Sequence, residues 1–330
     1  EKEINSLIEN LEVYKNGYPY GFPNIPQAEN NIKQKINTLI VYKIWKVVNV
    51  RDLFDFYSIE ELQEIVNRVC DNDYQKIMNA RNITSIDLIT DFAVLGLYNI
   101  ILYLDDSPSM EKHDNRNSKM NRWDIQKQVA KTCLFWNMTM SNDGIYMRFR
   151  NNEFECNDIK TMDYLENMFN FKLEGKKHIC ERLKTNVIDE LLQPRIKNKM
   201  NKPTITIIFT DEKPDSSDQV IETIRKFQHS YYNSSYGEEA VKFSFCQIGI
   251  NRHAINWIIN SEYDKDIREN IKFTKTYKLW TDNKGTDRSS LWMRDFMLDS
   301  VLKKKERNKV KTFPQSQKEK YKKFNYSLYN

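Results

Sequence analysis

The fold is decided by one stretch of sequence, Ile100-Ile101-Leu102-Tyr103-Leu104-Asp105-Asp106-Ser107-Pro108-Ser109. Its apolar half extends back to Leu97 with one interruption at Asn99, and an apolar run of this kind is typical of a central strand that is buried on both faces. A second run, from Thr204 to Phe209, is rich in β-branched residues and ends in Thr210 and Asp211. Two buried strands that each end in an acid predict a sheet whose C-terminal edge carries carboxylates.

Outward from these two runs, strand patterns and helix patterns alternate. Further strands are expected at residues 145–149 and 241–250, and helices at 125–136, 160–169, 181–192, 216–227, 255–259 and 291–302. Strands that alternate with helices of this length favour a parallel sheet, because each parallel connection needs a crossover. The predicted fold class is therefore α/β, a Rossmann-like, doubly wound and mostly parallel sheet flanked by helices.

Residues before the first strand predict a helical prefix. Ser58 and Glu61 form a capping-box pattern at the start of one helix. A second helix is expected at 72–79, and a third begins at Thr84 or Ser85. We divide the chain into an irregular or helical segment (1–50), a helical prefix that packs on the domain (51–96), the α/β domain (97–302) and a basic, flexible tail (303–330).

Composition narrows the class of protein. The chain is 40% hydrophobic and 12% aromatic, enough for a buried core. Its longest apolar run, from Phe92 to Leu104, is too short to span a bilayer. Five scattered cysteines without a CxxC pair indicate a reducing compartment, so we expect a cytoplasmic protein. The segment from Lys303 to Lys323 contains ten basic and two acidic residues. It carries more positive charge than the net +5 of the whole chain, so we expect the remainder to be a mildly acidic globule.

The Asp-x-Ser-x-Ser turn after a buried strand resembles the metal-ion-dependent adhesion site of von Willebrand factor A (vWA) domains. Residues from about 55 to 302 look like a group of fungal vWA proteins, with the same Asp-Asp-Ser-x-Ser turn, a Thr-Asp-x-x-Pro turn at Thr210 to Pro214 and a closing Leu-Trp helix. The resemblance implies a Mg²⁺ ion, whose coordination a partner's Asp or Glu completes. The implied metal ligands are Asp105, Ser107, Ser109 and Asp211. Oxygen ligands with water-filled positions are what Mg²⁺ requires.

Two departures from the family pattern concern the metal. Alignment of Gly175 and Leu183 with the family's loop places Lys177 where the family has a metal-binding Thr. Glu212 replaces the usual Gly after the second acid. Two carboxylates without a counter-charge repel each other. One hypothesis is that the Lys177 ammonium replaces the cation, in part or wholly; the alternatives are a bound Mg²⁺, or an empty site with Lys177 in water.

Enzymatic motifs are absent from the sequence. It has no P-loop, no Gly-x-Gly-x-x-Gly and no Gly-x-Ser-x-Gly, and its four histidines show neither metal-site nor triad spacing. We therefore expect a non-enzymatic module, without a small-molecule substrate, that binds a protein partner at the edge of the sheet. The residues expected to face that partner are Asp106, Lys177, His178 and Glu212.

The basic tail supports an alternative function. An RNA- or ribosome-associated factor could hold phosphates with this tail and use the vWA domain as a scaffold. The residues that would do so are Lys303, Lys304, Lys305, Arg307, Lys309 and Lys311. Binding sensitive to a chelator would favour the adhesion site, and binding that falls steeply with salt would favour the tail.

Overall fold

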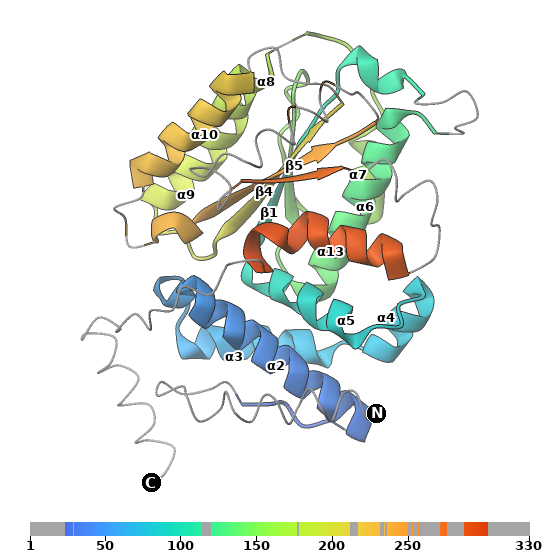
Figure 1. Ribbon diagram of the computed structural model, residues 1–330, viewed down its shortest axis with the longest axis vertical. Helices are drawn as coiled ribbons and strands as arrows, with labels where there is room; N and C mark the ends of the chain where they lie inside the picture. Colours follow the sequence, from blue (N-terminus) through green and yellow to red (C-terminus); the bar gives the residue numbers. More distant parts are fainter. Residues whose placement is uncertain are drawn as a thin grey trace.

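A six-stranded sheet with strand order β3-β2-β1-β4-β5-β6 lies at the centre of the protein (Figure 1). The computed structural model describes residues 24–28, 30–113, 120–176, 178–211, 217–231, 234, 236–249, 253, 257, 271–275 and 287–302. The strands are β1 (Asn99–Leu104), β2 (Ile145–Phe149), β3 (Cys156–Ile159), β4 (Thr204–Thr210), β5 (Val241–Gln247) and β6 (Ile271–Lys275). All neighbouring strands are parallel except β2 and β3, so the predicted mostly parallel α/β sheet is confirmed.

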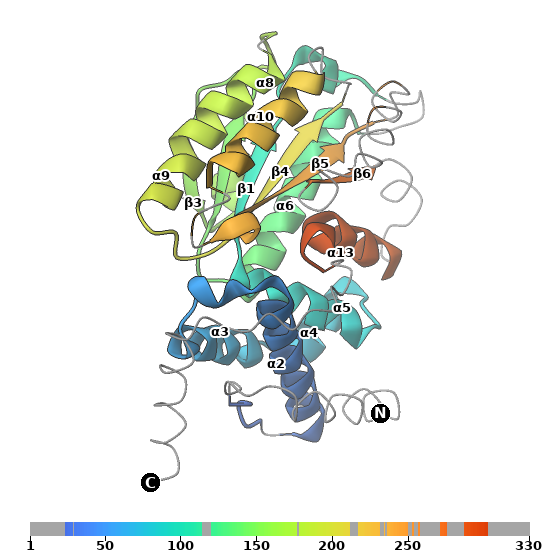
Figure 2. The same cartoon turned by 60° about the vertical axis from the view of Figure 1, so that its left-hand side comes forward.

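Helices cover both faces of this sheet (Figures 1 and 2). One face carries α6 (Arg122–Met140), α7 (Met162–Asn167) and α13 (Asp287–Leu302). The other carries α8 (Ile179–Arg182), α9 (Gln193–Lys197) and α10 (Ser217–Tyr231), and a π-helical segment, Leu183–Leu192, joins α8 to α9. Every residue of β1 and β4 is buried, which explains why these strands are mostly apolar or β-branched and do not alternate with charged residues.

A layer of helices lies at the N-terminal edge of the sheet (Figure 2). It consists of α2 (Asn31–Arg51), α3 (Ile59–Asp71), α4 (Tyr74–Arg81) and α5 (Ile86–Ala93). A 3₁₀ turn, Val94–Leu97, leads from this layer straight into β1. The layer therefore lies opposite the edge at which β1 and β4 end in acids.

The start of α3 follows its local sequence code. The side chain of Ser58 accepts a hydrogen bond from the Glu61 N–H at 3.2 Å, and the Glu61 carboxylate accepts one from the Ser58 N–H at 2.7 Å. This capping box pairs N–H groups that the first turn of a helix cannot satisfy itself. The predicted capping box is confirmed.

One hydrophobic core runs through the helical layer and the sheet, from Ile36 to Val301. The buried Arg51 ties the two parts together, because its guanidinium donates to the carbonyls of Val301 at 2.7 Å and Ser300 at 3.0 Å. Among the described helices, none is both long enough and apolar enough to cross a bilayer.

Some elements differ from expectation. Helix α2 occupies much of the segment expected to be irregular or helical and runs one residue past its boundary at residue 50. Strands β3 and β6 were not predicted, and β1 begins at Asn99 rather than Leu97 because the preceding residues form the 3₁₀ turn. The helix expected at 255–259 falls largely outside the described residues.

Candidate functional site

Two acids meet at the C-terminal edge of the sheet. Asp105 directly follows β1, and Asp211 directly follows β4. These strands are parallel neighbours, paired from Asn99 with Thr204 to Tyr103 with Ile208, so their carboxyl ends lie side by side. Asp105 is 1% exposed and Asp211 is 0% exposed. The structure therefore brings together the two acids that the sequence pattern singled out.

The backbone at Asp105 is held by helix α6. The Gln126 side chain accepts a hydrogen bond from the Asp105 N–H at 3.1 Å and donates one to the Asp105 carbonyl at 2.9 Å. The carboxylate of Asp105 in turn accepts the N–H of Ser107 at 3.0 Å. The hydroxyls of Ser107 and Ser109 lie 2.9 Å apart and bond to each other. The turn is thus fixed by its own hydrogen bonds and by α6.

Asp106 points to the loop that follows β2 rather than to a partner surface. Its carboxylate accepts the N–H of Asn151 at 2.7 Å, the side-chain amide of Asn151 at 3.0 Å and the N–H of Asn152 at 2.8 Å. Burial raises the pKa of Asp106, and the two backbone N–H groups oppose that rise. Asp106, which we expected to face a partner, is buried and joins the ends of β1 and β2.

Each of the two strand-end acids is paired with an arginine. Arg122, the first residue of α6, donates from Nη1 to Asp211 Oδ2 at 2.7 Å. Arg150, the residue after β2, places Nη1 at 3.4 Å from Asp105 Oδ1 and at 3.3 Å from Asp105 Oδ2. Burial raises the pKa of Asp105; Arg150 opposes the shift and Asp211 adds to it. In the described part of this edge, Asp105 and Asp211 therefore each face a guanidinium, while Asp106 is held by N–H groups.

Sequence reasoning did not find these arginines. Arg150 directly follows the strand expected at residues 145–149, and Arg122 follows a polar stretch, and neither lies in a motif. One signal could have indicated Arg150. It directly follows a strand predicted to lie in the same parallel sheet, so it had to lie at the same edge as the acids.

Several expected site residues lie elsewhere or outside the described residues. His178 is exposed at the start of α8, close to β1, because Tyr103 Oη donates to the Ile179 carbonyl at 3.3 Å. Lys177 and Glu212 lie outside the described residues. The structure therefore does not test the hypothesis of a Lys177 ammonium between the acids. The tail residues 303–330, with all six expected phosphate-binding positions, also lie outside the described residues.

The donor set at this edge does not suit Mg²⁺. The ion needs carboxylate or hydroxyl oxygens that are free to turn towards it. Here Asp105 and Asp211 each face a guanidinium, and the two serine hydroxyls bond to each other. Asp211 Oδ1 is a buried oxygen without a hydrogen-bond partner, but it is a single atom. Within the described ranges, no three His, Cys, Asp or Glu side chains are grouped closely enough to hold a metal ion.

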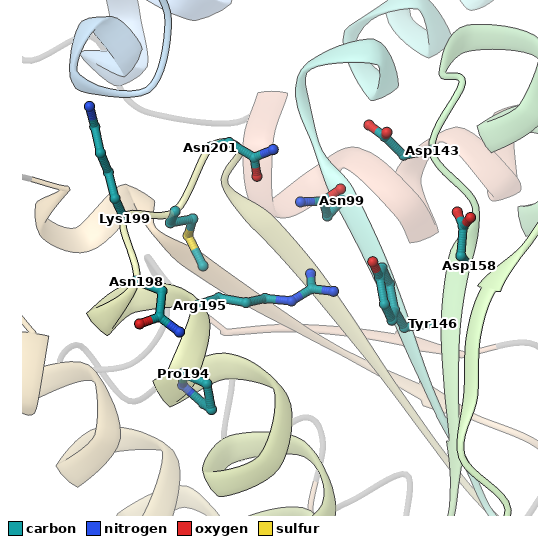
Figure 3. Close-up of a pocket in the computed structure, with 10 residues that line it drawn as sticks. Asn99, Asp143, Tyr146, Asp158, Pro194, Arg195, Asn198, Lys199 and Asn201 are labelled. Atoms are coloured by element: carbon teal, nitrogen blue, oxygen red, sulfur yellow. The ribbon is translucent and has the colours of Figure 1, made fainter.

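A separate polar pocket lies near the N-terminal ends of β1, β2 and β4 (Figure 3). It has a volume of about 340 Å³. The guanidinium of Arg195 lies 3.9 Å from the centre of the Tyr146 ring, and Asn99 and Asn201 also line the space. This pocket lies at the opposite edge from Asp105 and Asp211, so it is not part of the site described above.

Comparison with known proteins does not show a family for this chain. No protein-family model matches the sequence, and no curated protein matches it. Among solved structures, the chain is similar to proximal thread matrix protein 1 from the mussel byssus, with a TM-score of 0.38 and 15% sequence identity. The match covers 62% of this chain and 47% of the mussel protein, so this chain spans less than half of that protein's length.

Proposed function

We propose that this chain is a non-enzymatic protein-interaction module of the vWA type, and that its partner binds at the C-terminal edge of the sheet. The observation that carries the proposal is the meeting of Asp105 and Asp211 at the ends of neighbouring parallel strands, beside the Ser107–Ser109 turn. In open α/β sheets, ligands bind in the crevice beyond the carboxyl ends of the central strands.

The charges at this edge fit a binding role better than a catalytic one. Asp105 and Asp211 are each held by an arginine, and Asp106 is held by three N–H groups of one loop. Burial raises the pKa of Asp105 to about 6, within the range of a general base, but its carboxylate is already paired with Arg150. Buried carboxylates paired in this way hold the strand ends in place.

A protein partner is favoured by the loop beside Asp106. Phe154 lies on this loop, and its N–H donates to the side chain of Asn152 at 3.0 Å. The ring is 49% exposed and contacts Phe171 at 5.8 Å between ring centres. Exposed aromatic side chains are enriched where proteins bind one another. An aromatic residue therefore borders the proposed binding edge.

Site-specific photocrosslinking tests the proposal. A photoreactive amino acid is placed at Glu111 or Phe154, which are exposed next to the edge, and at Lys197 as a control on an exposed helix end far from it. In an extract of cells that express the protein, Glu111 and Phe154 should yield the same adduct, and Lys197 should not. The adduct should be lost in Asp105→Ala, with circular dichroism as the check on folding.

Adducts formed only from Lys197, or equally from all three positions, would contradict a binding edge at the strand ends. The RNA alternative is distinguished in the same extracts. It predicts adducts that disappear after nuclease treatment and after removal of residues 303–330.

A further inference from the structure

The buried acids Asp105 and Asp211 require positive charge from somewhere. They follow neighbouring strands and are almost fully buried, and the charge of Asp211 adds to the raised pKa of Asp105. Two carboxylates this close, in a medium that screens poorly, cannot both stay ionised without a nearby cation. A divalent ion is one source of that charge, and side-chain cations are another.

Arg122 occupies a position that is unfavourable for a cation unless the cation has a specific partner. It is the first residue of α6, where the helix dipole favours negative charge. The helix start is fixed by a capping box between Asn121 and Asp124, so Arg122 cannot leave this position without unwinding the first turn. Its side chain is only 12% exposed and donates to Asp211. The ion pair with Asp211 explains why an arginine lies at the start of α6.

The register of α6 joins this pair to the other acid. Gln126 lies four residues after Arg122, hence on the same face of the helix. Gln126 holds the backbone of Asp105 through two hydrogen bonds, while Arg122 holds the carboxylate of Asp211. One face of α6 therefore bridges the ends of β1 and β4, which is what a metal ion shared between both strands would otherwise do.

Arg150 supplies the second cation from the other side. Its N–H donates to the Leu104 carbonyl at 2.9 Å, so its backbone is bound at the very end of β1. Its side chain is 11% exposed, and Nη1 is within 3.4 Å of both carboxylate oxygens of Asp105. A buried guanidinium of this kind remains charged at any physiological pH.

We propose that Arg122 and Arg150 take the place of a divalent cation at this edge, so that the site is held together by two internal ion pairs and works without metal. The charges of two guanidiniums balance those of Asp105 and Asp211. A divalent ion would have to displace both arginines, or add its charge beside two acids that are already paired with cations. The biological role of this edge rests on the proposed function. The metal-binding test needs no partner, so the inference and the proposed function can each fail while the other stands.

The test is a calorimetric titration of Mn²⁺ into the full-length chain after removal of metal with a chelator. The unmodified chain should show no saturable binding. The double variant Arg122→Ala, Arg150→Ala should gain one saturable site, and adding Asp105→Asn should abolish it. The matched control, Arg122→Lys with Arg150→Lys, keeps both charges and should bind no ion.

Two results would overturn the inference. One is an unmodified chain that binds an ion and loses it in Asp105→Asn. The other is a folded double-alanine variant that binds no ion, because the two arginines would then not be the reason why the unmodified chain binds none. If the double-alanine variant does not fold by circular dichroism, the unmodified chain and the lysine pair decide the question, because an ion bound by either contradicts the proposal.

Discussion

Replacing Arg122 by methionine should destabilise the protein strongly, because it removes the cation from a carboxylate that is 0% exposed. Truncating one partner of a buried ion pair costs about 3–5 kcal/mol. Arg122 is 12% exposed, so water can reach Asp211 once the guanidinium is gone, and we expect the lower end, about 3 kcal/mol. For a cooperative unit of this size, that loss corresponds to a fall in Tm of about 4–6 °C.

The assay is urea unfolding followed by circular dichroism on Arg122→Met, Asp211→Asn and the double variant. If the pair is coupled, the double variant should lose clearly less free energy of unfolding than the two single variants lose in sum. Lys184→Met is the control, because Lys184 pairs with Asp189 at 2.7 Å while 60% exposed. An exposed pair should contribute at most about 1 kcal/mol. Strictly additive losses, or a loss no larger than that of Lys184→Met, would refute the reasoning.

Three further predictions concern the supports of the site and the opposite edge of the sheet. Gly175→Ala should cost more than about 1 kcal/mol, because Gly175 has φ +97° and an added Cβ would lie 2.7 Å from Asn151 Oδ1; an unchanged Tm would contradict this. Gln126→Leu should cost at least about 2 kcal/mol, because two buried backbone groups lose their partners; the free energy of unfolding in urea measures it, and no loss would contradict the bridging role of α6. Lys202→Met should show a pH-dependent loss. Burial acts to raise the pKa of Asp143, but its hydrogen bond and charge interaction with Lys202 lower it below 3.8. An acid with a lowered pKa stabilises the fold above its ordinary pKa and loses this effect as pH falls through the lowered value. The loss should therefore be present at neutral pH and vanish in acid. It should stay below about 1 kcal/mol, because Asp143 is half exposed and burial lowers the pKa of Lys202 itself. A loss that is the same at both pH values would contradict it.

The sheet could be predicted because its signal is local. Strands β1 and β4 are buried at every position and consist mostly of apolar and β-branched residues, and such runs have few alternatives to a central parallel strand. The rule that parallel strands end at one edge then places Asp105 beside Asp211 without any knowledge of side-chain contacts. The acids of the candidate site follow from burial and topology alone.

Other elements have no such local signal. Helix α2 has eleven buried positions among its 21 residues, so it shows no single apolar stripe that would mark it as amphipathic. Strand β3 has four residues, of which the middle two are exposed. Its pairing with β2 decides that it is a strand, since a segment this short carries almost no pattern of its own.

The sequence by itself determined the alternation of the central strands with helices, the buried acids at the strand ends and the Asp-x-Ser-x-Ser turn, because each depends on residues close together in the chain. Only the tertiary structure decided what neutralises those acids. Arg122 lies 89 residues from Asp211, and Arg150 lies 45 from Asp105. The physical reason is that an ion pair depends on the register of α6 and the end of β2 against the sheet. An arginine at the start of a helix, such as Arg122, or just after a strand, such as Arg150, looks the same in sequence whether it faces water or a buried carboxylate.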